Sequence, residues 1–379
     1  MKVYQHGPEL ELEEGRRWRE SPGYGQWIRS LDLPIHTGFY IEDLRTIETG
    51  WWEERGCNSA FVQLYGLEDI QDVRVMEIPP GKSTKPWRFA LDDVFYVLSG
   101  KGLATVWSDE HSARKTFEWQ ERSLFMIPHQ LHCQLSNASG EKPARLLSHN
   151  YLPLALQAVE EPDFFFNNPN LPGRTDLLEA FYSEAKEEIS KEETEEWRRT
   201  RWVGNFFPDM GVWDKMVPYR HRGAGGWSVS VSFPNSSRGA AMSIFPELRY
   251  KKGHRHVSGV FIIIPAGVGY SIIHEPGLTK EPVICHWQEG SCFAPQFYHQ
   301  HFNLGKTPAR YLKFGPGGVR RYAERHMPRV QTEYPDEAAW IREYFEKELA
   351  KRDLTSLMPG GVYKDKDFNW EYAEDSNAD

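Results

Sequence analysis

The chain has 379 residues, of which 45 are Lys or Arg and 54 are Asp or Glu, and its formal net charge of −9 argues against nucleic acid, whose binding needs a basic patch. No apolar run reaches the roughly 18–20 residues of a membrane span, no apolar signal segment follows Met1, and the four cysteines form neither a CxxC pair nor a dense framework. These features predict a cytoplasmic globular protein, long enough for two domains, whose partners include neither nucleic acid nor a membrane.

The first half of the chain begins with an N-terminal extension, residues 1–55, that is rich in aromatic side chains. Residues 56–160 hold short runs of β-forming residues separated by Gly, Pro, Asp and Ser, which predict a first β-barrel. Residues 161–215 are expected to form a helical linker. Within it, residues 174–202 are rich in Ala, Glu and Lys and predict a helix, and their acidic run indicates a solvated helix face.

The second half repeats this pattern. Residues 216–325 contain another series of short β-rich runs and predict a second barrel. Residues 326–379 are expected to form a helical tail, in which residues 336–351 predict an amphipathic helix.

The two β-rich regions match each other in order along the chain, which indicates an internal duplication. The matched pairs, at spacings of 165 to 167 residues, are Met76 with Met242, Gly100 with Gly267, Gly102 with Gly269, Pro128 with Pro295, His132 with His299, and Arg145 with Arg310. Short strands with regular turn signals, present in two copies, predict an all-β fold of two tandem jelly-roll barrels.

The strongest chemical signal is Gly253-His254-Arg255-His256, which enters the apolar run 260–264. Residues i and i+2 of a strand point to the same face, so His254 and His256 can both face a barrel interior. Two imidazoles are half of a site for Fe(II), Mn(II), Ni(II) or Zn(II). His299 or His301 would supply a third imidazole from a distant strand. The alternative is that the sequence KKGHRH is a basic surface turn.

These motifs resemble those of the cupin superfamily, in which Gly precedes His-x-His and a later His is followed four residues on by Asn, as His299 is by Asn303. The two copies resemble a bicupin, with two double-stranded β-helix barrels. Together with the Gly-Tyr-Ser segment at 269–271, they are most similar to gentisate 1,2-dioxygenase and related ring-cleaving dioxygenases. The resemblance implies one divalent metal per chain, with His254, His256 and His299 as its ligands. Fe(II) is favoured, and Mn, Ni or Zn are the alternatives.

The sequence departs from the family pattern at two places. Val260 and Phe261 stand where cupins commonly carry a glutamate, which leaves three neutral imidazoles as the donor set. In the first copy, Trp87 and Phe89 stand where the two histidines are expected, and only His132 remains. We therefore expect a metal-free N-terminal barrel and a metal-binding C-terminal barrel.

Other polar residues are candidates for catalysis beside the metal. His301 or His286 could accept a phenolic proton. Tyr270, in the Gly-Tyr-Ser segment, either faces the substrate or belongs to the barrel wall. His286 can equally satisfy polar groups of the core. Residues read as structural are His132, His149 and His326.

Three neutral ligands leave about three positions open on a six-coordinate Fe(II). Such a site suits a small-molecule substrate that chelates through two oxygens, together with O2. We therefore expect an Fe(II)-dependent dioxygenase that acts on a hydroxylated aromatic acid or a similar chelating compound. The alternatives are an oxygen-independent lyase, isomerase or decarboxylase that uses the same three-His site, and a non-catalytic ligand-binding bicupin. Because bicupins commonly assemble, a homo-oligomer is expected.

Overall fold

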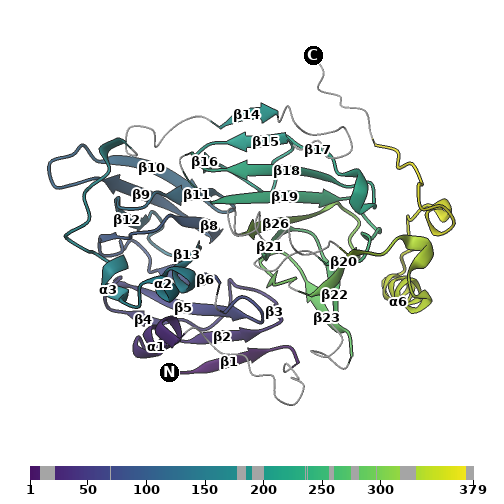
Figure 1. The fold of residues 1–379 in the computed structure, drawn as a ribbon, viewed down its shortest axis with the longest axis horizontal. Helices are drawn as coiled ribbons and strands as arrows, with labels where there is room; N and C mark the ends of the chain where they lie inside the picture. Colours follow the sequence, from purple (N-terminus) through teal and green to yellow (C-terminus); the bar gives the residue numbers. More distant parts are fainter. Residues whose placement is uncertain are drawn as a thin grey trace.

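The structure is a computed structural model, and it describes residues 1–8, 22–68, 70–176, 185–189, 200–234, 236, 238–255, 260–274, 281–295, 297–315 and 330–372. Two β-barrels stand side by side, each built from a larger and a smaller sheet (Figure 1). The predicted all-β fold of two tandem double-stranded β-helix barrels is confirmed. Among the described residues, no helix is both long and apolar enough to cross a membrane.

The first barrel pairs a sheet in the order β1-β2-β5-β6-β13-β8-β11-β16, with β4 beside β5, with a smaller sheet in the order β10-β9-β12-β7. The strands of the larger sheet are β1 (Val3–His6), β2 (Ile35–Gly38), β4 (Gly50–Trp52), β5 (Cys57–Leu64), β6 (Asp72–Ile78), β8 (Asp93–Ser99), β11 (Leu124–Ile127), β13 (Ala144–Asn150) and β16 (Phe206–Phe207). The smaller sheet consists of β7 (Trp87–Arg88), β9 (Lys101–Trp107), β10 (Lys115–Gln120) and β12 (His132–Asn137).

The second barrel pairs a sheet in the order β14-β15-β18-β19-β26-β21-β24-β3, with β17 beside β18, with a smaller sheet in the order β23-β22-β25-β20-β27. The strands of the larger sheet are β3 (Tyr40–Ile41), β14 (Lys186–Ile189), β15 (Thr200–Val203), β17 (Val217–Pro218), β18 (Trp227–Ser232), β19 (Gly239–Phe245), β21 (Phe261–Ala266), β24 (Cys292–Phe293) and β26 (Ala309–Gly315). The smaller sheet consists of β20 (His254–Arg255), β22 (Gly269–His274), β23 (Val283–Trp287), β25 (Tyr298–Asn303) and β27 (Val330–Gln331).

The strand order shows the duplication directly. The run β6-β13-β8-β11 of the first barrel has its counterpart in β19-β26-β21-β24 of the second. The smaller sheets correspond in the same way, with β10-β9-β12-β7 matching β23-β22-β25-β20. Each barrel can therefore serve as a reference for the other, residue by residue.

The helix predicted over residues 174–202 is wrong for two of the three parts that the structure describes, residues 185–189 and 200–202, whereas Thr175 and Asp176 are helical. β14 and β15 are strands that pair with each other antiparallel, and β15 also pairs parallel with β18. Trp202 packs against the core shared by the two barrels. Pairing at a sheet edge and burial of the indole outweigh the local helix propensity. Residues 177–184 and 190–199 of the predicted helix lie outside the described residues.

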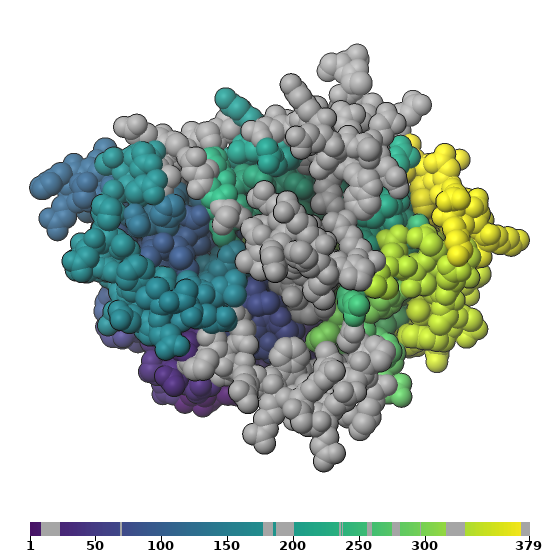
Figure 2. Space-filling model, viewed as in Figure 1, coloured from purple at the N-terminus to yellow at the C-terminus, as the bar shows by residue number. Residues whose placement is uncertain are grey.

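The helices lie at the margins of the barrels. The α-helices are α1 (Pro22–Ser30), α2 (Leu152–Ala158), α3 (Pro162–Phe165) and α6 (Ala339–Ala350), and the 3-10 helices are η2 (Arg220–Arg222), η3 (Tyr334–Asp336) and η4 (Gly360–Tyr363). The predicted C-terminal helix is confirmed as α6. The C-terminal segment, in yellow, lies at the end of the molecule away from the first barrel (Figure 2). There Phe345 and Leu349 of α6 pack against aromatic residues of the second barrel.

The N-terminal extension belongs to both barrels. β2 pairs parallel with β5 and β1 pairs parallel with β2, so both strands extend the larger sheet of the first barrel. A few residues later β3 pairs antiparallel with β24, at the edge of the larger sheet of the second barrel. The extension therefore ties the two barrels together through backbone hydrogen bonds.

One apolar core lies between the two larger sheets and contains residues from both barrels. His149 is buried at its edge, with its ring 5.0 Å from Phe314 of the second barrel, measured between ring centroids. Arg238 donates to His149 Nδ1, and the opposite ring nitrogen lies 2.8 Å from Gln71 Oε1. Because Nδ1 accepts, Nε2 must carry the proton that Gln71 receives, so the imidazole is held neutral. The structural role expected for His149 is confirmed.

Stability should fall in acid because of His149. Burial, with the Arg238 charge as a second cause, holds the pKa of His149 well below its ordinary value. Below about pH 6.5 the unfolded chain binds a proton that the folded chain excludes, and stability is lost by up to about 1.4 kcal/mol per pH unit. We expect the thermal midpoint to fall less steeply between pH 7 and pH 5 in His149→Gln than in the wild type. His111→Gln, on the exposed surface, is the control. Equal slopes in wild type and His149→Gln would contradict this.

Candidate metal centre

The pairing of the strands shows which residues of the two smaller sheets occupy equivalent positions near the imidazoles. Asn137 pairs with Gly102 in the first barrel, and Asn303 pairs with Gly269 in the second. Both asparagines donate their side-chain amide to carbonyl oxygens of the following loop and accept from a backbone N–H two residues on. The two asparagines therefore occupy equivalent positions.

Counting back from these asparagines places Cys133 at the position of His299 and Leu135 at the position of His301. The predicted match of His132 with His299 is therefore wrong by one residue. A shift of one residue turns a strand side chain to the other face of the sheet. Accordingly His132 is only half-buried and stacks on Trp107, with 5.3 Å between ring centroids.

The first barrel has apolar side chains at the positions where imidazoles are found in the second. Trp87 pairs with Cys133 as His254 pairs with His299, which places Trp87 at the position of His254. Trp87, Cys133 and Leu135 are all buried in one apolar core with Phe95. Side-chain packing thus occupies this part of the first barrel.

The second barrel brings three imidazoles together on β20 and β25. The exposed fractions of the side chains of His254, His299 and His301 are 5%, 1% and 2%. The ring centroids of His254 and His299 are 4.3 Å apart, and that of His301 lies 5.1 Å from His299 and 6.2 Å from His254. His256, the other histidine of the motif, lies outside the described residues.

Two of these imidazoles are oriented by backbone carbonyls. His254 Nδ1 lies 2.9 Å from the carbonyl oxygen of Lys252, and His299 Nδ1 lies 2.7 Å from that of Phe297. A carbonyl oxygen only accepts, so each Nδ1 carries the hydrogen and each Nε2 presents its lone pair. Hydrogen bonds of this kind prepare histidines for metal binding in metalloproteins.

His301 has a different partner. Its Nδ1 lies 2.8 Å from Ser271 Oγ, which also receives a hydrogen bond from Trp287 Nε1 at 3.1 Å. A hydroxyl can donate or accept, so His301 is not restricted to one tautomer. This difference favours His299 as the ligand, and it suits His301 to proton transfer. The choice of third ligand stays a prediction.

Burial also sets the charge of His299. It lowers the pKa of His299 to about 3, opposed by the hydrogen bond to the Phe297 carbonyl. At neutral pH the imidazole is therefore uncharged, which is the form that binds a metal.

The imidazoles of His254 and His299 are donors of a kind that divalent metals bind. Two donors do not complete a metal site within the described residues. Among these residues, no group of three or more His, Cys, Asp or Glu side chains is arranged to hold a metal ion. His254 and His299 supply two imidazoles whose Nδ1 atoms bond to carbonyl oxygens, which leaves Nε2 as the donor atom that Fe(II), Mn(II), Ni(II) and Zn(II) accept. The third donor expected from the sequence is His256.

Tyr270 and His286 do not face the cluster, which corrects their assignment as catalytic candidates. Side chains alternate along β22, and Ser271 points to His301. Tyr270 therefore points the other way, where it stacks on Phe302 with 4.5 Å between ring centroids. His286 pairs with Tyr270 across the strands and is exposed. Both residues lie on the outer face of the smaller sheet.

Lys251 is a polar residue of this barrel that the sequence analysis missed. Interpreted as part of a basic surface turn, it would be exposed, yet its side chain is fully buried. Its ammonium lies 2.8 Å from Ser243 Oγ and 3.1 Å from Tyr311 Oη. The ring of Tyr311 in turn lies 5.1 Å from that of His301. The duplication was the available signal, because Lys251 falls on Thr84 at a spacing of 167 residues.

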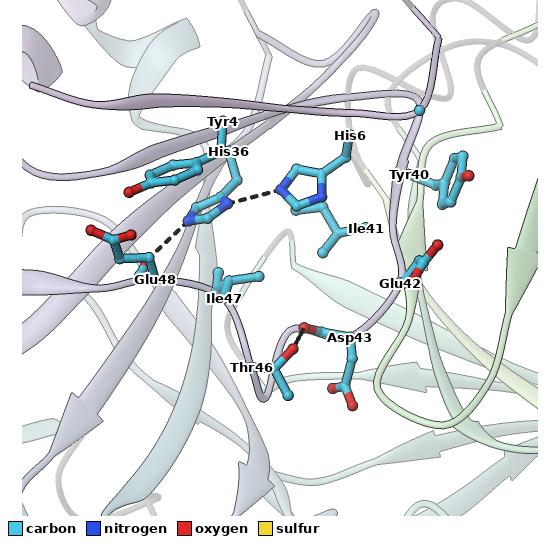
Figure 3. Close-up of a pocket in the computed structure, with 11 residues that line it drawn as sticks. Tyr4, His6, His36, Tyr40, Ile41, Glu42, Asp43, Thr46, Ile47 and Glu48 are labelled. Atoms are coloured by element: carbon cyan, nitrogen blue, oxygen red, sulfur yellow. Dashed lines mark hydrogen bonds between the residues drawn. The ribbon is translucent and has the colours of Figure 1, made fainter.

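A cavity of about 320 Å³ lies apart from this cluster, between β1, β2 and the segment that follows β3 (Figure 3). His36 donates from Nε2 to the carbonyl oxygen of Glu48, so its Nδ1 accepts from His6 Nε2 at 2.9 Å. None of the residues lining this cavity belongs to the imidazole cluster.

Comparisons with known proteins leave the activity open. No family model matches the sequence, and no curated protein matches it. Oxalate decarboxylase from Bacillus subtilis is 12% identical over 85% of this chain and 86% of that chain, with a TM-score of 0.45. The 7S globulin of Momordica charantia is 14% identical over 74% of this chain and 84% of that chain, with a TM-score of 0.44. Likenesses at this level of identity say nothing about activity.

Replacing either carbonyl-oriented histidine should remove bound metal. We expect His254→Ala and His299→Ala each to lose most of the metal that the wild-type chain retains after dialysis, as measured by elemental analysis. His132→Ala is the matched control, because His132 lies on the outward face of the equivalent strand. Circular dichroism would verify folding. A folded His299→Ala protein with wild-type metal content would show that the ligand assignment is wrong.

Proposed function

We propose that this protein is a metal-dependent enzyme whose C-terminal barrel binds one divalent metal through His254, His256 and His299. The observation that carries the proposal is the pair of buried imidazoles whose Nδ1 atoms bond to carbonyl oxygens. Their counterparts in the other barrel are Trp87 and Cys133. A barrel that needed these positions only for packing would be served by apolar residues, as the first barrel is.

The reaction that we propose is dioxygenation of a hydroxylated aromatic acid or a similar chelating compound, with Fe(II) as the metal. When bound, Fe(II) supplies open coordination positions and a one-electron redox couple, and three neutral ligands leave its charge uncompensated. An anionic substrate that chelates through two oxygens suits such a centre.

His301 is the proposed acid–base residue. In the tautomer whose Nδ1–H donates to Ser271 Oγ, its Nε2 accepts a phenolic proton, and the hydroxyl stabilises the resulting imidazolium. Phe293 and Tyr311 contact the imidazole ring and limit the access of water. Tyr270 and His286 have no part in this proposal.

Lys251 is the observation that favours a second candidate, an oxygen-independent lyase, isomerase or decarboxylase that uses the same metal site. A buried amine near the imidazoles can return a proton to a carbanion, a step that such reactions need and ring cleavage does not. Under this candidate the bound metal would be Mn, Ni or Zn.

Oxygen uptake tests the proposed reaction. After anaerobic reconstitution with Fe(II), we expect at least one phenolic acid to drive oxygen consumption in the wild-type protein. His299→Ala should consume at least a hundredfold less, because loss of a metal ligand removes the centre and the charge stabilisation it supplies.

Dioxygenation would be excluded if the wild type consumed no more oxygen than His299→Ala with every phenolic acid and every other chelating carbonyl compound tested. Metal analysis of protein purified without added metal separates the two candidates. Iron supports the first candidate, and manganese, zinc or nickel supports the second. Ligand binding without turnover under either set of conditions would identify a binding protein. The predicted homo-oligomer is tested separately, by the mass of the particle in solution.

A further inference from the structure

Lys251 lies in the interior of the second barrel, next to the imidazole cluster. Its backbone N–H donates to the carbonyl oxygen of His301 at 3.0 Å, which positions it one strand away from that residue. Its ammonium lies 4.9 Å from the ring centroid of Tyr311 and 5.1 Å from that of Phe245. Both rings belong to the apolar core of this barrel. The charge is therefore directed into the barrel and not toward solvent.

The first barrel shows that the fold does not require a lysine at this position. Thr84 donates from its backbone to Leu135, as Lys251 does to His301. The Gln134 side chain bonds to the carbonyl of Thr84, as the Gln300 side chain bonds to that of Lys251. Backbone and flanking contacts are thus the same in both barrels, and only the buried side chain differs.

The residues that contact the Lys251 ammonium also differ from their counterparts in the first barrel. Ser243 and Tyr311 pair across β19 and β26, and their counterparts across β6 and β13 are Met76 and Leu146. The predicted match of Met76 with Met242 is therefore wrong by one residue. The hydroxyls that contact the ammonium are therefore absent from the equivalent part of the first barrel. The amine and its two hydroxyl partners, like the imidazoles, distinguish the second barrel from the first.

The described surroundings of Lys251 hold no compensating anion. Its ammonium is hydrogen-bonded to two neutral hydroxyls, and the structure shows no ion pair to Lys251 within the described part of the chain. The neighbouring Lys252 does have one, with Glu333. The guanidinium of Arg222, a charge of like sign, also acts on Lys251. A buried ammonium without a counter-ion is costly, and an anion would relieve that cost.

We propose that Lys251 binds the carboxylate of an anionic substrate inside the second barrel. This inference rests on the proposed function in one respect, because it takes the interior of this barrel as the substrate site. A carboxylate at Nζ would form a charge-assisted hydrogen bond in a region shielded from water by Phe245 and Tyr311. The substrate would then be positioned by its acid group at Lys251, with its other oxygens free to reach the metal site.

The ionisation of Lys251 is consistent with this role. Burial lowers the pKa of its ammonium to about 7, opposed by the effect of Tyr219 and assisted to a lesser extent by the charge of Arg222. A carboxylate beside Nζ would raise that pKa again, so binding above pH 7 would take up a proton. The other groups that face this region are Tyr311 from β26 and His301 from β25.

The test compares acids with their neutral amides on the full chain loaded with metal. Isothermal titration would measure binding of benzoate and benzamide, and of 2-hydroxybenzoate and 2-hydroxybenzamide, at pH 6.5. We expect the wild type to prefer each acid. Lys251→Met should weaken binding of the acid about ten- to a hundredfold, the range expected for a hydrogen bond to a charged group. Affinity for the amides should not change.

Two further variants complete the experiment. Lys251→Thr introduces the residue of the first barrel and should match Lys251→Met. Lys306→Met removes the same charge from the exposed surface of the same barrel and should behave as the wild type. Thermal midpoint and metal content of each variant would verify that fold and metal site are intact. Above pH 7 the wild-type affinity for the acids should fall about tenfold per pH unit, and this dependence should vanish in Lys251→Met.

The proposal is overturned if the wild type shows no preference for any acid over its amide. It is equally overturned if folded Lys251→Met and Lys251→Thr keep the wild-type preference. If these variants lost acid binding but the wild type consumed no oxygen, dioxygenation would be excluded. The proposed anion site at Lys251 would still stand. If Lys251→Met kept oxygen uptake with unchanged Michaelis constants, the anion site would be excluded and the dioxygenase would stand.

Discussion

The chemistry of this molecule depends on the register between two short strands, β20 and β25. Because side chains alternate along a strand, His299 and His301 share one face of β25, and Gln300 between them points to the other face. His254 lies directly opposite His299 on β20. A slip of one residue would replace imidazoles by Tyr298 and Gln300 on the inner face. Asn303 opposes such a slip, since its amide joins the end of β25 to two carbonyl oxygens outside the strand.

The duplicated barrel shows what these polar groups cost. In the first barrel the equivalent positions pack into a continuous core with Trp119 and Phe125, which gains the full benefit of apolar burial. In the second barrel the same scaffold buries three imidazoles and an amine, and each needs a partner to offset its desolvation. The carbonyls of Lys252 and Phe297 and the hydroxyl of Ser271 supply these partners. The two barrels therefore divide the tasks of stability and chemistry between them.

The sequence was sufficient to predict the two barrels and the C-terminal helix, because β-rich runs, turn signals and an ordered repeat can be recognised in a single chain. That His254 and His299 are metal ligands stays a prediction, although the structure brings the two imidazoles together. Three features depended on contacts that local patterns do not contain. Pairing with β18 turned a helix-like segment into strand β15. The strand pairing shows that Cys133, and not His132, is equivalent to His299. This one-residue difference in spacing cannot be seen in the sequence alone. The burial of Lys251 followed from its place beside β25, where its side chain reaches Ser243 of β19 and Tyr311 of β26, whereas its neighbours in sequence suggested a surface turn.

The pairing of β3 with β24 has a consequence for the order of events during synthesis. β3 leaves the ribosome well before its partner, which follows about 250 residues later along the chain. Contacts so distant in sequence close late and slowly, because the intervening chain must first be ordered. β3 therefore stays without this pairing until β24 has been made. Until that moment the nascent chain exposes an unpaired strand edge to other chains.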